Sequence, residues 1–425
     1  MRQGTKGITS CWWGGRCVCA ALLTLMLAGC AKVVKVTVTG STAGERAGEM
    51  VELPADSIFR LLGFPKRGRT VVVNGPDGEE IPYQLTHDGL LIFPLSGSEG
   101  GKGVAYTIQR GQPAPVDTLV CGRQYPERLD DISWENDLSG YRIYGPASLQ
   151  AGNHLYGYDI FTKNVARRVL EERYALDLSP TYRAQIENLR ELGLTDEADS
   201  LQRAISYHVD HGEGMDAYDV GPTLGGGGSA VLTPGGELLY QKTYESFEVL
   251  DNGPLRFTVR LTYPPMTVGH DSAVVETRVI QLDQGSYLNK TTVSLAGLTA
   301  PIGIVAGCVI HRQSPDTYLY SAHDGFIACA DSTSNPRAGH GVVFVGLAFP
   351  IEVPDVREQA FPQPKGSAIG QVMALIPYSP GSQIVYYWGS GWSHAQVHDL
   401  TEWSTVMRLA AARLRQPLTV RIENL

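Results

Sequence analysis

The chain has 425 residues, of which 43% are hydrophobic and 19% charged, a globular composition that fits one large domain or two moderate ones. The formal net charge is −9 and no stripe of Lys and Arg occurs, which argues against nucleic acid as a partner because phosphate neutralisation requires clustered positive charge. The 48 Gly and 25 Pro residues favour short strands joined by turns.

Residues 1–30 are predicted to be a targeting segment. Arg2, Lys6 and Arg16 precede an apolar run that ends in Leu-Ala-Gly-Cys30, which is similar to a lipobox. The run has about a dozen residues and is too short to span a bilayer comfortably. We therefore expect an exported lipoprotein, periplasmic or attached to the outer membrane through lipidated Cys30. An ordinary signal peptide or an uncleaved anchor is the alternative.

Three cysteines remain after the leader and the lipidated residue are set aside, namely Cys121, Cys308 and Cys329. They allow at most one intramolecular disulfide in an oxidising compartment. Cys308 and Cys329 flank a predicted pair of neighbouring strands, so they are the candidate pair. The absence of a CxxC motif argues against a thiolate zinc site.

Residues 34–112 are predicted to form a small N-terminal β-sandwich. Asn-Gly and Asp-Gly turn signals separate its short strand-like runs, such as VVKVTVT and TVVVNG. The stretch 111–119, rich in Pro and Gly, is predicted to be a linker. The second domain is then expected over residues 120–425.

Helical periodicity within the second domain is predicted over residues 159–205. Apolar residues recur there at spacings of three and four, as in VARRVLEERYAL, which indicates a short helical insertion against a β core. From residue 229 the pattern returns to strands, and the run TEWSTVMRLAAARLR is predicted to be a last helix that ends the chain.

The first polar cluster, WENDLSGYRIYG, is expected at a strand end or tight turn. Trp134 could stack on the apolar face of a sugar ring, Glu135 and Asn136 could bind its hydroxyl groups, and Arg142 could bind a carboxylate. The alternative is structural, with Trp134 in the core and an ion pair between Glu135 and Arg142.

The second polar cluster lies within YHVDHGEGMDAY, residues 207–218, and allows three interpretations. In one, His211 and Glu213 exchange protons with a sugar. In another, His208 and Asp210 join them to bind a divalent cation such as Ca²⁺ or Zn²⁺. In the third, the polar side chains satisfy one another and hold a loop.

Two further residues are candidates for the same site. Trp392 lies in the aromatic segment YYWGSGW and either lines the cleft or packs in the core. His311 follows the apolar run GIVAGCVI and either points into the cleft or is a satisfied histidine at a strand end.

The segments WENDLSGYRIYGPA, YHVDHGEGMDAYDVGPTLGGGGSA and YYWGSGW, in this order, resemble the DUF4861 family from about residue 40 to the C-terminus. The resemblance implies an exported protein of the kind typical of Bacteroidetes, often encoded near enzymes that use pectin and uronates. It also implies a galactose-mutarotase-like β-supersandwich with a sugar cleft on its concave face. It implies no settled reaction.

We therefore predict a mainly β protein, with a small N-terminal β-sandwich and a mutarotase-like antiparallel β-supersandwich that carries a short helical insertion. The predicted function is general acid/base chemistry on uronic-acid-containing, pectin-like oligosaccharides or polysaccharides, as a lyase or a hydrolase. His211 is the predicted base, and Tyr218 or Glu213 the acid. The alternatives are a non-catalytic glycan-binding lipoprotein and a sugar epimerase or mutarotase.

Overall fold

The computed structural model describes residues 32–425 except 41–45, 65–68, 98–102, 315 and 333–334. The predicted signal peptide and Cys30 lie outside the described residues. Within the described part of the chain, no helix has both the length and the apolar character needed to cross a membrane.

The first module consists of two antiparallel sheets around one core. One sheet has the order β27-β1-β7-β3-β4 and the other the order β2-β6-β5. Alternation along β1 directs Val34, Val36 and Val38 into the core. The elements are β1 (Val33–Thr39), β2 (Met50–Pro54), α1 (Ala55–Leu61), β3 (Val71–Asn74), β4 (Glu80–Ile81), β5 (Gln84–Leu85), β6 (Leu90–Pro94), β7 (Val104–Arg110) and β27 (Thr419–Asn424).

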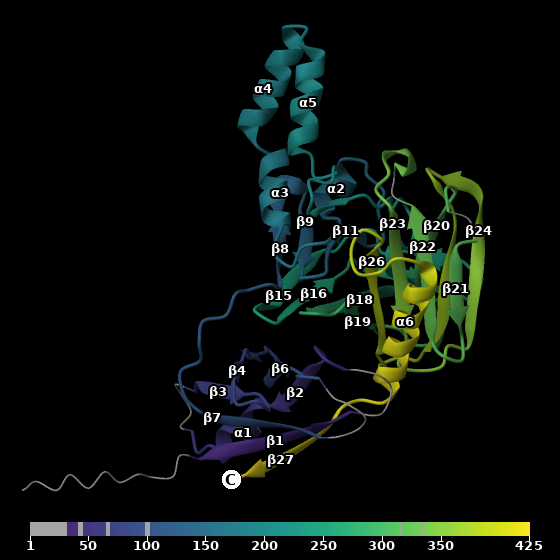
Figure 1. Cartoon of the computed structure of the whole chain (residues 1–425). Helices are drawn as coiled ribbons and strands as arrows, with labels where there is room; N and C mark the ends of the chain where they lie inside the picture. The colour runs from purple at the N-terminus through teal and green to yellow at the C-terminus, as the bar shows by residue number, and fades with distance from the viewer. Residues whose placement is uncertain (1–31, 41–45, 65–68, 98–102, 315, 333–334) are drawn as a thin grey trace, which may run out of the picture. The chain divides into compact units, whose positions relative to one another are not determined.

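The prediction that a helix ends the chain is wrong. The last helix, α6 (Leu400–Arg415), is followed by β27, which pairs antiparallel with β1 so that Val36 faces Ile422 (Figure 1). β27 has six residues, and only neighbouring β1 supplies the backbone partners that make it a strand. Such a short segment carries little periodicity of its own.

Three further antiparallel sheets form the larger part of the described chain. The site sheet contains β8 (Cys121–Tyr125), β9 (Asp131–Glu135), β10 (Ser139–Ile143), β11 (Asp159–Lys163) and β12 (Gly214–Asp216). The middle sheet contains β13 (Gly226–Leu232), β14 (Leu238–Leu239), β20 (Ile302–His311), β24 (Asp355–Lys365) and β25 (Ala368–Tyr378). The long sheet contains β15 (Ser246–Asn252), β16 (Arg256–Thr262), β17 (Met266–Val268), β18 (Asp271–Asp283), β19 (Leu288–Ala296), β21 (Tyr318–Ser321), β22 (Phe326–Ser332), β23 (Val342–Ala348) and β26 (Ile384–Trp392).

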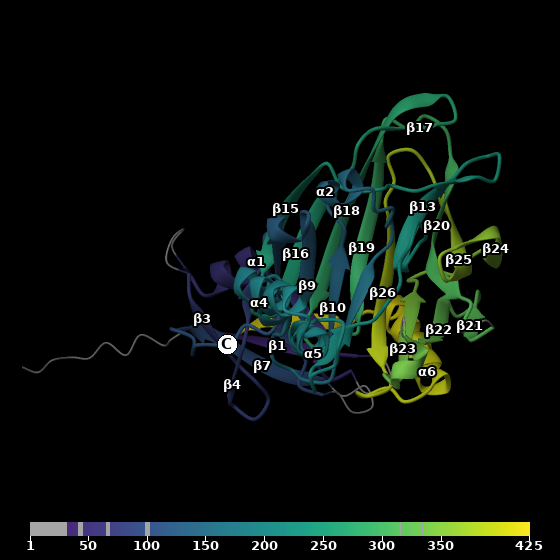
Figure 2. The same cartoon turned by 90° about the horizontal axis from the view of Figure 1, so that it is seen from above.

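The site sheet and the middle sheet together face the long sheet. A parallel bridge between Tyr158 and Gly225 joins the first two, and the long-sheet strands β16, β18, β19 and β26 run side by side opposite them (Figure 2). One continuous core contains side chains from all three sheets, including Trp134, Ile304 and Val345. The predicted mainly β fold with antiparallel sheets and few helices is therefore confirmed.

The helical insertion begins later than predicted. Asp159–Lys163, which opens the predicted insertion 159–205, forms β11 and is buried along its whole length. The helices that follow are α3 (Leu170–Asp177), α4 (Pro180–Glu191) and α5 (Thr195–Ile205), and α4 and α5 form a hairpin that extends away from the sheets (Figure 1). The remaining short helices are η1 (Pro126–Arg128), α2 (Pro146–Gln150) and η2 (Pro336–Ala338).

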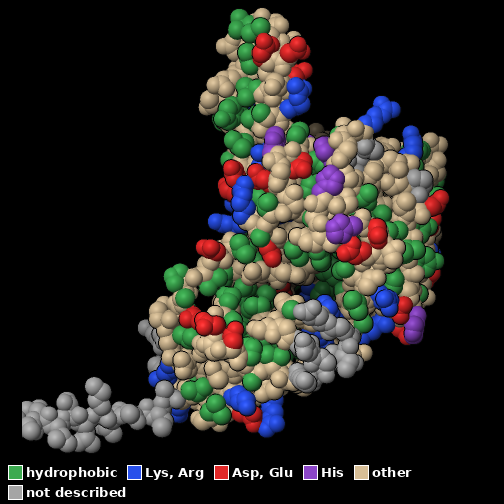
Figure 3. Space-filling view, in the orientation of Figure 1, with side chains coloured by type: hydrophobic (Ala, Val, Ile, Leu, Met, Phe, Trp, Pro, Cys, Tyr) green, Lys and Arg blue, Asp and Glu red, His purple; other side chains and the backbone are tan. Residues whose placement is uncertain are grey.

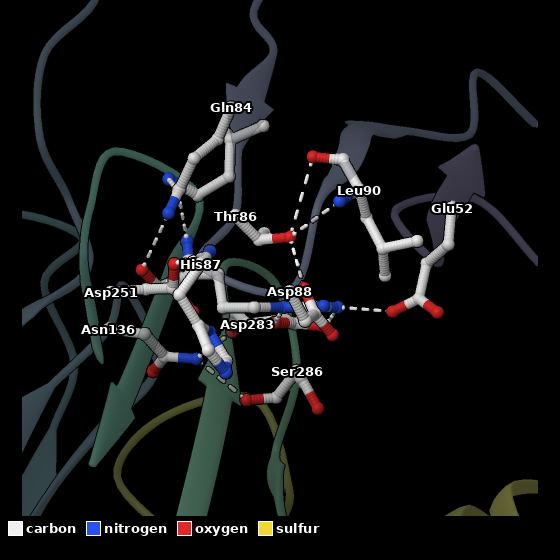
Figure 4. Close-up of polar contacts among 12 residues, drawn as sticks. Glu52, Gln84, Thr86, His87, Asp88, Leu90, Asn136, Asp251, Asp283 and Ser286 are labelled. Atoms are coloured by element: carbon white, nitrogen blue, oxygen red, sulfur yellow. Dashed lines mark hydrogen bonds and ion pairs between the residues drawn. The ribbon is translucent and has the colours of Figure 1, made fainter. Parts of the chain in front are cut away.

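Buried polar contacts join the first module to the long sheet (Figure 4). The Gln84 amide oxygen accepts the backbone N–H groups of Leu255 and Arg256 at 2.9 and 2.8 Å. His87 Nδ1 lies 2.7 Å from Asp251 Oδ2. Because these contacts satisfy polar groups at the junction, they fix how the module meets β15 and β16.

Cys308 on β20 and Cys329 on β22 lie in sheets that face each other. Their Sγ atoms are 2.6 Å apart, both side chains are buried, and both are thiols in the structure. The proposed pair is therefore in contact across the core, although its strands belong to different sheets.

We expect these thiols to form a disulfide when the folded protein is exposed to oxidised glutathione. The two thiols would lose two protons and two electrons, and the glutathione disulfide would be reduced. The bond should add about 2–4 kcal/mol to the free energy of unfolding, measured by urea denaturation with and without reductant. Cys121→Ser serves as the control and should leave this difference unchanged. Persistence of both thiols, detected by alkylation after unfolding, would contradict the expectation.

Candidate functional site

Three carboxyl groups converge on one guanidinium on the outer face of the site sheet. Arg142 lies opposite Asp159 in the strand register, and its Nη2 pairs with the carboxylates of Asp159 and, at 3.0 Å, Asp216. Asp131 Oδ2 lies 3.9 Å from Arg142 Nε, and its Oδ1 accepts the N–H of Gly145 at 3.1 Å. We call Asp131, Arg142, Asp159 and Asp216 the carboxylate cluster.

Arg128 brings a second guanidinium to the edge of the cluster. Its Nη2 is 4.0 Å from Asp131 Oδ2, which is a loose ion pair, and its Nε forms no hydrogen bond with the described residues. The guanidinium lies over the rings of Tyr174 and Tyr207, at 3.9 and 4.4 Å from their centres. These rings pack against the faces of the guanidinium, and Tyr207 also forms a side-chain hydrogen bond with it.

The backbone that follows Arg128 is held in an uncommon conformation. Leu129 and Asp130 both have positive φ, at 58° and 66°. Gly145 packs directly on this turn, because a Cβ atom there would lie 2.2 Å from the Asp130 carbonyl carbon. Non-glycine residues in the left-handed region cost free energy and concentrate at functional sites. The turn therefore places Arg128 at the expense of local stability.

His208 lies at the surface beside the cluster. Its Nδ1 is 2.9 Å from the backbone oxygen of Asp216 and 4.0 Å from Asp216 Oδ1, and its side chain is 58% exposed. A carbonyl oxygen only accepts hydrogen bonds, so the proton is on Nδ1, and Nε2 of the neutral ring is left as an acceptor.

The cluster lies just beneath the molecular surface. Arg128, Arg142 and Tyr144 each retain 8% exposure, and the Tyr144 hydroxyl donates to Asp159 Oδ2 at 2.5 Å. Figure 3 shows acidic and basic side chains gathered around the base of the helical hairpin.

Burial makes two of these carboxyl groups weaker acids than an ordinary aspartate, because it raises their pKa. Burial raises the pKa of Asp131 to about 6, although Arg142 acts in the opposite direction. Burial also raises the pKa of Asp216, again against the attraction of Arg142. The neighbouring Asp159 and Asp216 hold the pKa of Arg142 well above its ordinary value in spite of burial, which lowers it. The cluster thus combines a permanent cation with a proton that is exchanged near neutral pH.

The predicted sugar-stacking role of Trp134 is wrong. The side chain has no exposed surface, its Nε1 donates to Asn289 Oδ1 at 2.8 Å, and its ring stacks on Phe257. Alternation along β9 explains the error, because Asp131 and Glu135 face outward and Trp134 must then face the core.

Glu135 and Asn136 were predicted to contact a sugar, and this prediction is wrong. Both are structural residues. Glu135 Oε2 pairs with Lys163 Nζ at 2.7 Å, and its carboxylate accepts the N–H groups of Val169 and Leu170 where α3 begins. Asn136 Nδ2 donates to two backbone oxygens at 2.7 Å, and the residue is fully buried. Glu135 therefore anchors the insertion to the site sheet through charge and hydrogen bonds.

Arg142 and Trp392 also differ from their predicted roles. Arg142, predicted to bind a substrate carboxylate, already pairs with two protein carboxylates. Trp392 is 2% exposed, donates from Nε1 to the His340 oxygen at 2.8 Å and packs with Met215. Trp392 is therefore a core residue.

The predicted acid/base residues do not come together. His211 is exposed and its Nε2 lies 3.1 Å from the Ser206 oxygen, whereas Glu213 pairs with Arg167 at 2.8 Å. Tyr218 is buried beside the His311 ring, with 5.8 Å between ring centres. The three side chains thus have separate partners, so their assignment as one catalytic group is wrong.

The predicted cation site has no suitable geometry. Asp210 Oδ1 accepts the N–H groups of Gly212 and Gly214 at 2.8 and 3.0 Å, so it builds a turn. His208 contacts Asp216 instead. Among the described residues, no group of three or more His, Cys, Asp or Glu side chains could hold a metal ion. The residues present therefore do not fit Ca²⁺ or Zn²⁺.

The predicted site lacks several of the residues that do converge. Asp131, Asp159 and Arg128 were not singled out, although the alternation of DISWE shows which side chains share the outer face with Asp131. It also lacks Asp331, whose carboxylate bonds His311 Nδ1 in the core and, against the effect of burial, raises the pKa of His311. Partners so far apart in sequence leave no local signal.

Fold and site define the chain as a mainly β protein of antiparallel sheets with a buried acid–arginine cluster. The chain belongs to the family described as "Domain of unknown function (DUF4861)", whose model matches residues 38–420. This confirms the resemblance seen in the sequence. The chain is 25% identical over 352 residues to "Uncharacterized protein P7" of Formosa agariphila, an alignment that covers 80% of this chain and 79% of that protein.

Two solved structures from Enterococcus faecalis are similar to most of the chain at 7% sequence identity. One is an alpha-mannosidase, with a TM-score of 0.45 over 92% of this chain and 46% of the mannosidase. The other is a protein in glycosyl hydrolase family 38, with a TM-score of 0.44 over 92% of this chain and 47% of that protein. The chain thus spans less than half the length of each. At this level of similarity neither structure informs its function.

The raised pKa of Asp131 makes stability depend on pH. Its ordinary pKa is 3.8 and its native value about 6, so the native state binds the proton more tightly than the unfolded state. The stability that this proton contributes is complete below about pH 4 and is lost as the pH rises through about 6. Asp131→Asn should therefore gain roughly 1–3 kcal/mol over the wild type between pH 4 and pH 8, measured by urea unfolding. Asp199→Asn, on exposed α5, is the control. If the difference in free energy of unfolding between Asp131→Asn and the wild type did not change with pH, the raised pKa of Asp131 would be contradicted.

Glu135→Gln tests the anchor of the insertion. The substitution leaves the Lys163 ammonium buried without a counter-charge and should lower the free energy of unfolding by about 3–5 kcal/mol. The double variant Glu135→Gln, Lys163→Met should recover part of this loss. Glu172→Gln, which breaks an exposed pair with Arg167, should cost about 1 kcal/mol or less. Equal losses in Glu135→Gln and Glu172→Gln would refute the assignment.

Proposed function

We propose that the chain acts on uronic-acid-containing saccharides by general acid/base chemistry at the carboxylate cluster. The observation that carries the proposal is the convergence of three carboxyl groups, two guanidinium groups and one imidazole at the outer face of a single sheet. Groups with perturbed proton affinity cluster at functional sites, where burial and neighbouring charges tune them for proton transfer.

Asp131 is the proposed acid. A group with a pKa of about 6 still carries a proton near neutral pH and can give it to a leaving oxygen. Asp131 lies at the side of the cluster nearer to Arg128 and shares neither of the close contacts that tie Asp159 and Asp216 to Arg142.

Arg128 is the proposed partner of the sugar carboxylate, in place of Arg142. Its nearest protein carboxylate is 4.0 Å away, and its Nε has no hydrogen-bond partner among the described residues. A guanidinium binds a carboxylate through two parallel hydrogen bonds, and this geometry requires donors that are not already engaged.

His208 is the proposed base. Its Nδ1 is engaged by the Asp216 oxygen, so Nε2 is available to accept a proton at the exposed rim. In an elimination, Nε2 takes the proton on the carbon that bears the carboxylate, and the electrons of that bond form a carbon–carbon double bond. The glycosidic carbon–oxygen bond breaks and Asp131 protonates the leaving oxygen. In a hydrolysis, His208 would activate water.

Non-catalytic glycan binding is the second candidate function, because it requires no buried group of the carboxylate cluster to exchange a proton with the ligand. The four residues of the carboxylate cluster are each at most 8% exposed, and each already has a polar partner in the protein. A buried network of this kind can hold the site sheet and the loop that carries His208 in place without taking part in any reaction.

We also propose that the protein is exported and anchored through lipidated Cys30. The basic residues, the short apolar run and the Leu-Ala-Gly-Cys ending of residues 1–30 support this.

Product release from pectic, ulvan and arabinogalactan oligosaccharides tests the function, with unsaturated uronate and new reducing ends as readouts. Asp131→Asn and His208→Ala should each lower the rate by about 10²–10⁴-fold, whereas His211→Ala is a matched histidine control and should keep full activity. The wild-type rate should fall as the pH rises above about 6, because Asp131 then loses the proton that it must donate.

Two results would overturn the catalytic proposal. The first is saturable binding of these oligosaccharides without any product, which would favour the glycan-binding function. The second is loss of activity in His211→Ala with activity kept in His208→Ala. Interconversion of anomers or epimers without bond cleavage would keep the site but change the reaction.

A further inference from the structure

A cavity of about 520 Å³ lies between the first module and the long sheet. Its walls are residues 47–52 of the module, the adjoining ends of β18 and β19, and one side of α6. None of the carboxylate-cluster residues lines it. The volume is within the range of small-molecule sites, and junctions between domains are frequent places for them.

Lys290 lies at the centre of the sheet that forms one wall. In the strand register it faces Gln281 on one side and Tyr387 on the other. All three line the cavity, and all three are partly exposed. Lys290 lines the cavity and forms no ion pair with the described residues.

The acidic groups of the lining are already paired. Arg256 binds Glu52 at 2.7 Å and Asp283 at 2.6 Å, and Figure 4 labels both acidic residues. Glu49 pairs with the buried Arg46. Four cations, Arg46, Arg256, Lys290 and Arg413, thus stand against three carboxylates, Glu49, Glu52 and Asp283, in and next to the lining. The net charge of +1 favours a ligand with a single negative charge.

The rest of the lining suits a carbohydrate. Tyr287 and Tyr387 bring aromatic rings, and Gln284 and Ser286 bring amide and hydroxyl groups. Tyr287 is held edge-on against Trp403 of α6, with 5.7 Å between ring centres. Rings of this kind pack on the apolar faces of sugars, while amides and hydroxyls bind sugar hydroxyl groups.

We propose that this cavity is a second saccharide-binding site, in which Lys290 binds the carboxylate of a uronic acid and Tyr387 packs beside the sugar ring. The site holds the ligand and carries out no reaction. It takes the ligand class of the proposed function but does not depend on catalysis at the carboxylate cluster.

Calorimetric titration with digalacturonate, in the Asp131→Asn background so that no ligand is consumed, tests this site. We expect saturable binding that is at least about tenfold weaker in Lys290→Ala and unchanged in Lys242→Ala, an exposed lysine outside the cavity. A neutral digalactoside should bind at least about tenfold more weakly than digalacturonate.

A second variant fills the cavity without changing its charge. Ala410 on α6 lines the cavity and is partly exposed, so Ala410→Phe should also weaken binding while thermal unfolding shows a folded protein. Absence of saturable binding, or equal affinity in the parent, Lys290→Ala and Ala410→Phe proteins, would overturn the site. Neither outcome bears on product release by the wild type, so the two proposals fail independently.

Discussion

The pairing of Arg142 with Asp159 and Asp216 is the constraint on which the candidate site depends. The guanidinium joins β10, β11 and β12 through side chains that are each at most 8% exposed. Removing charges from water is costly, and the pairing offsets that cost only while both acids stay close to the arginine. Arg142 thereby engages two carboxylates and leaves Asp131, its more distant neighbour, to titrate near neutral pH.

The outer face of the site sheet also positions the segments that cover the carboxylate cluster, namely the helical insertion and the turn that follows Arg128. Glu135, two residues beyond Ser133 and four beyond Asp131 on β9, receives Lys163 and the first N–H groups of α3. The insertion is thus tied to the sheet that carries the cluster, and the segment after α5 brings His208 to its rim. The strained turn at Leu129 and Asp130 brings Arg128 from the other side. Sheet alternation, one helix anchor and one strained turn together assemble the site.

The sequence predicted the fold better than the site, for physical reasons. Periodicity and turn residues report strands and helices, so the β class, the helical insertion and the strand end at WEND could be predicted. They do not indicate which distant segments pair, so the pairing of β27 with β1 was not predicted. The convergence of Asp131 and Asp216 on Arg142 was not predicted for the same reason. Trp134 was misjudged because an aromatic residue beside polar ones fits both a sugar platform and a core position. His211 was favoured over His208 because the loop conformation decides which histidine meets the cluster.

The central claim is that Asp131 holds a proton near neutral pH in the folded protein. It is tested most directly by following the carboxyl ¹³C signal of Asp131, assigned with the Asp131→Asn variant, through a pH titration of the native chain. We expect a midpoint near 6. A midpoint at or below the ordinary value of 3.8 would contradict it, because the cluster would then contain only ionised carboxylates and no acid.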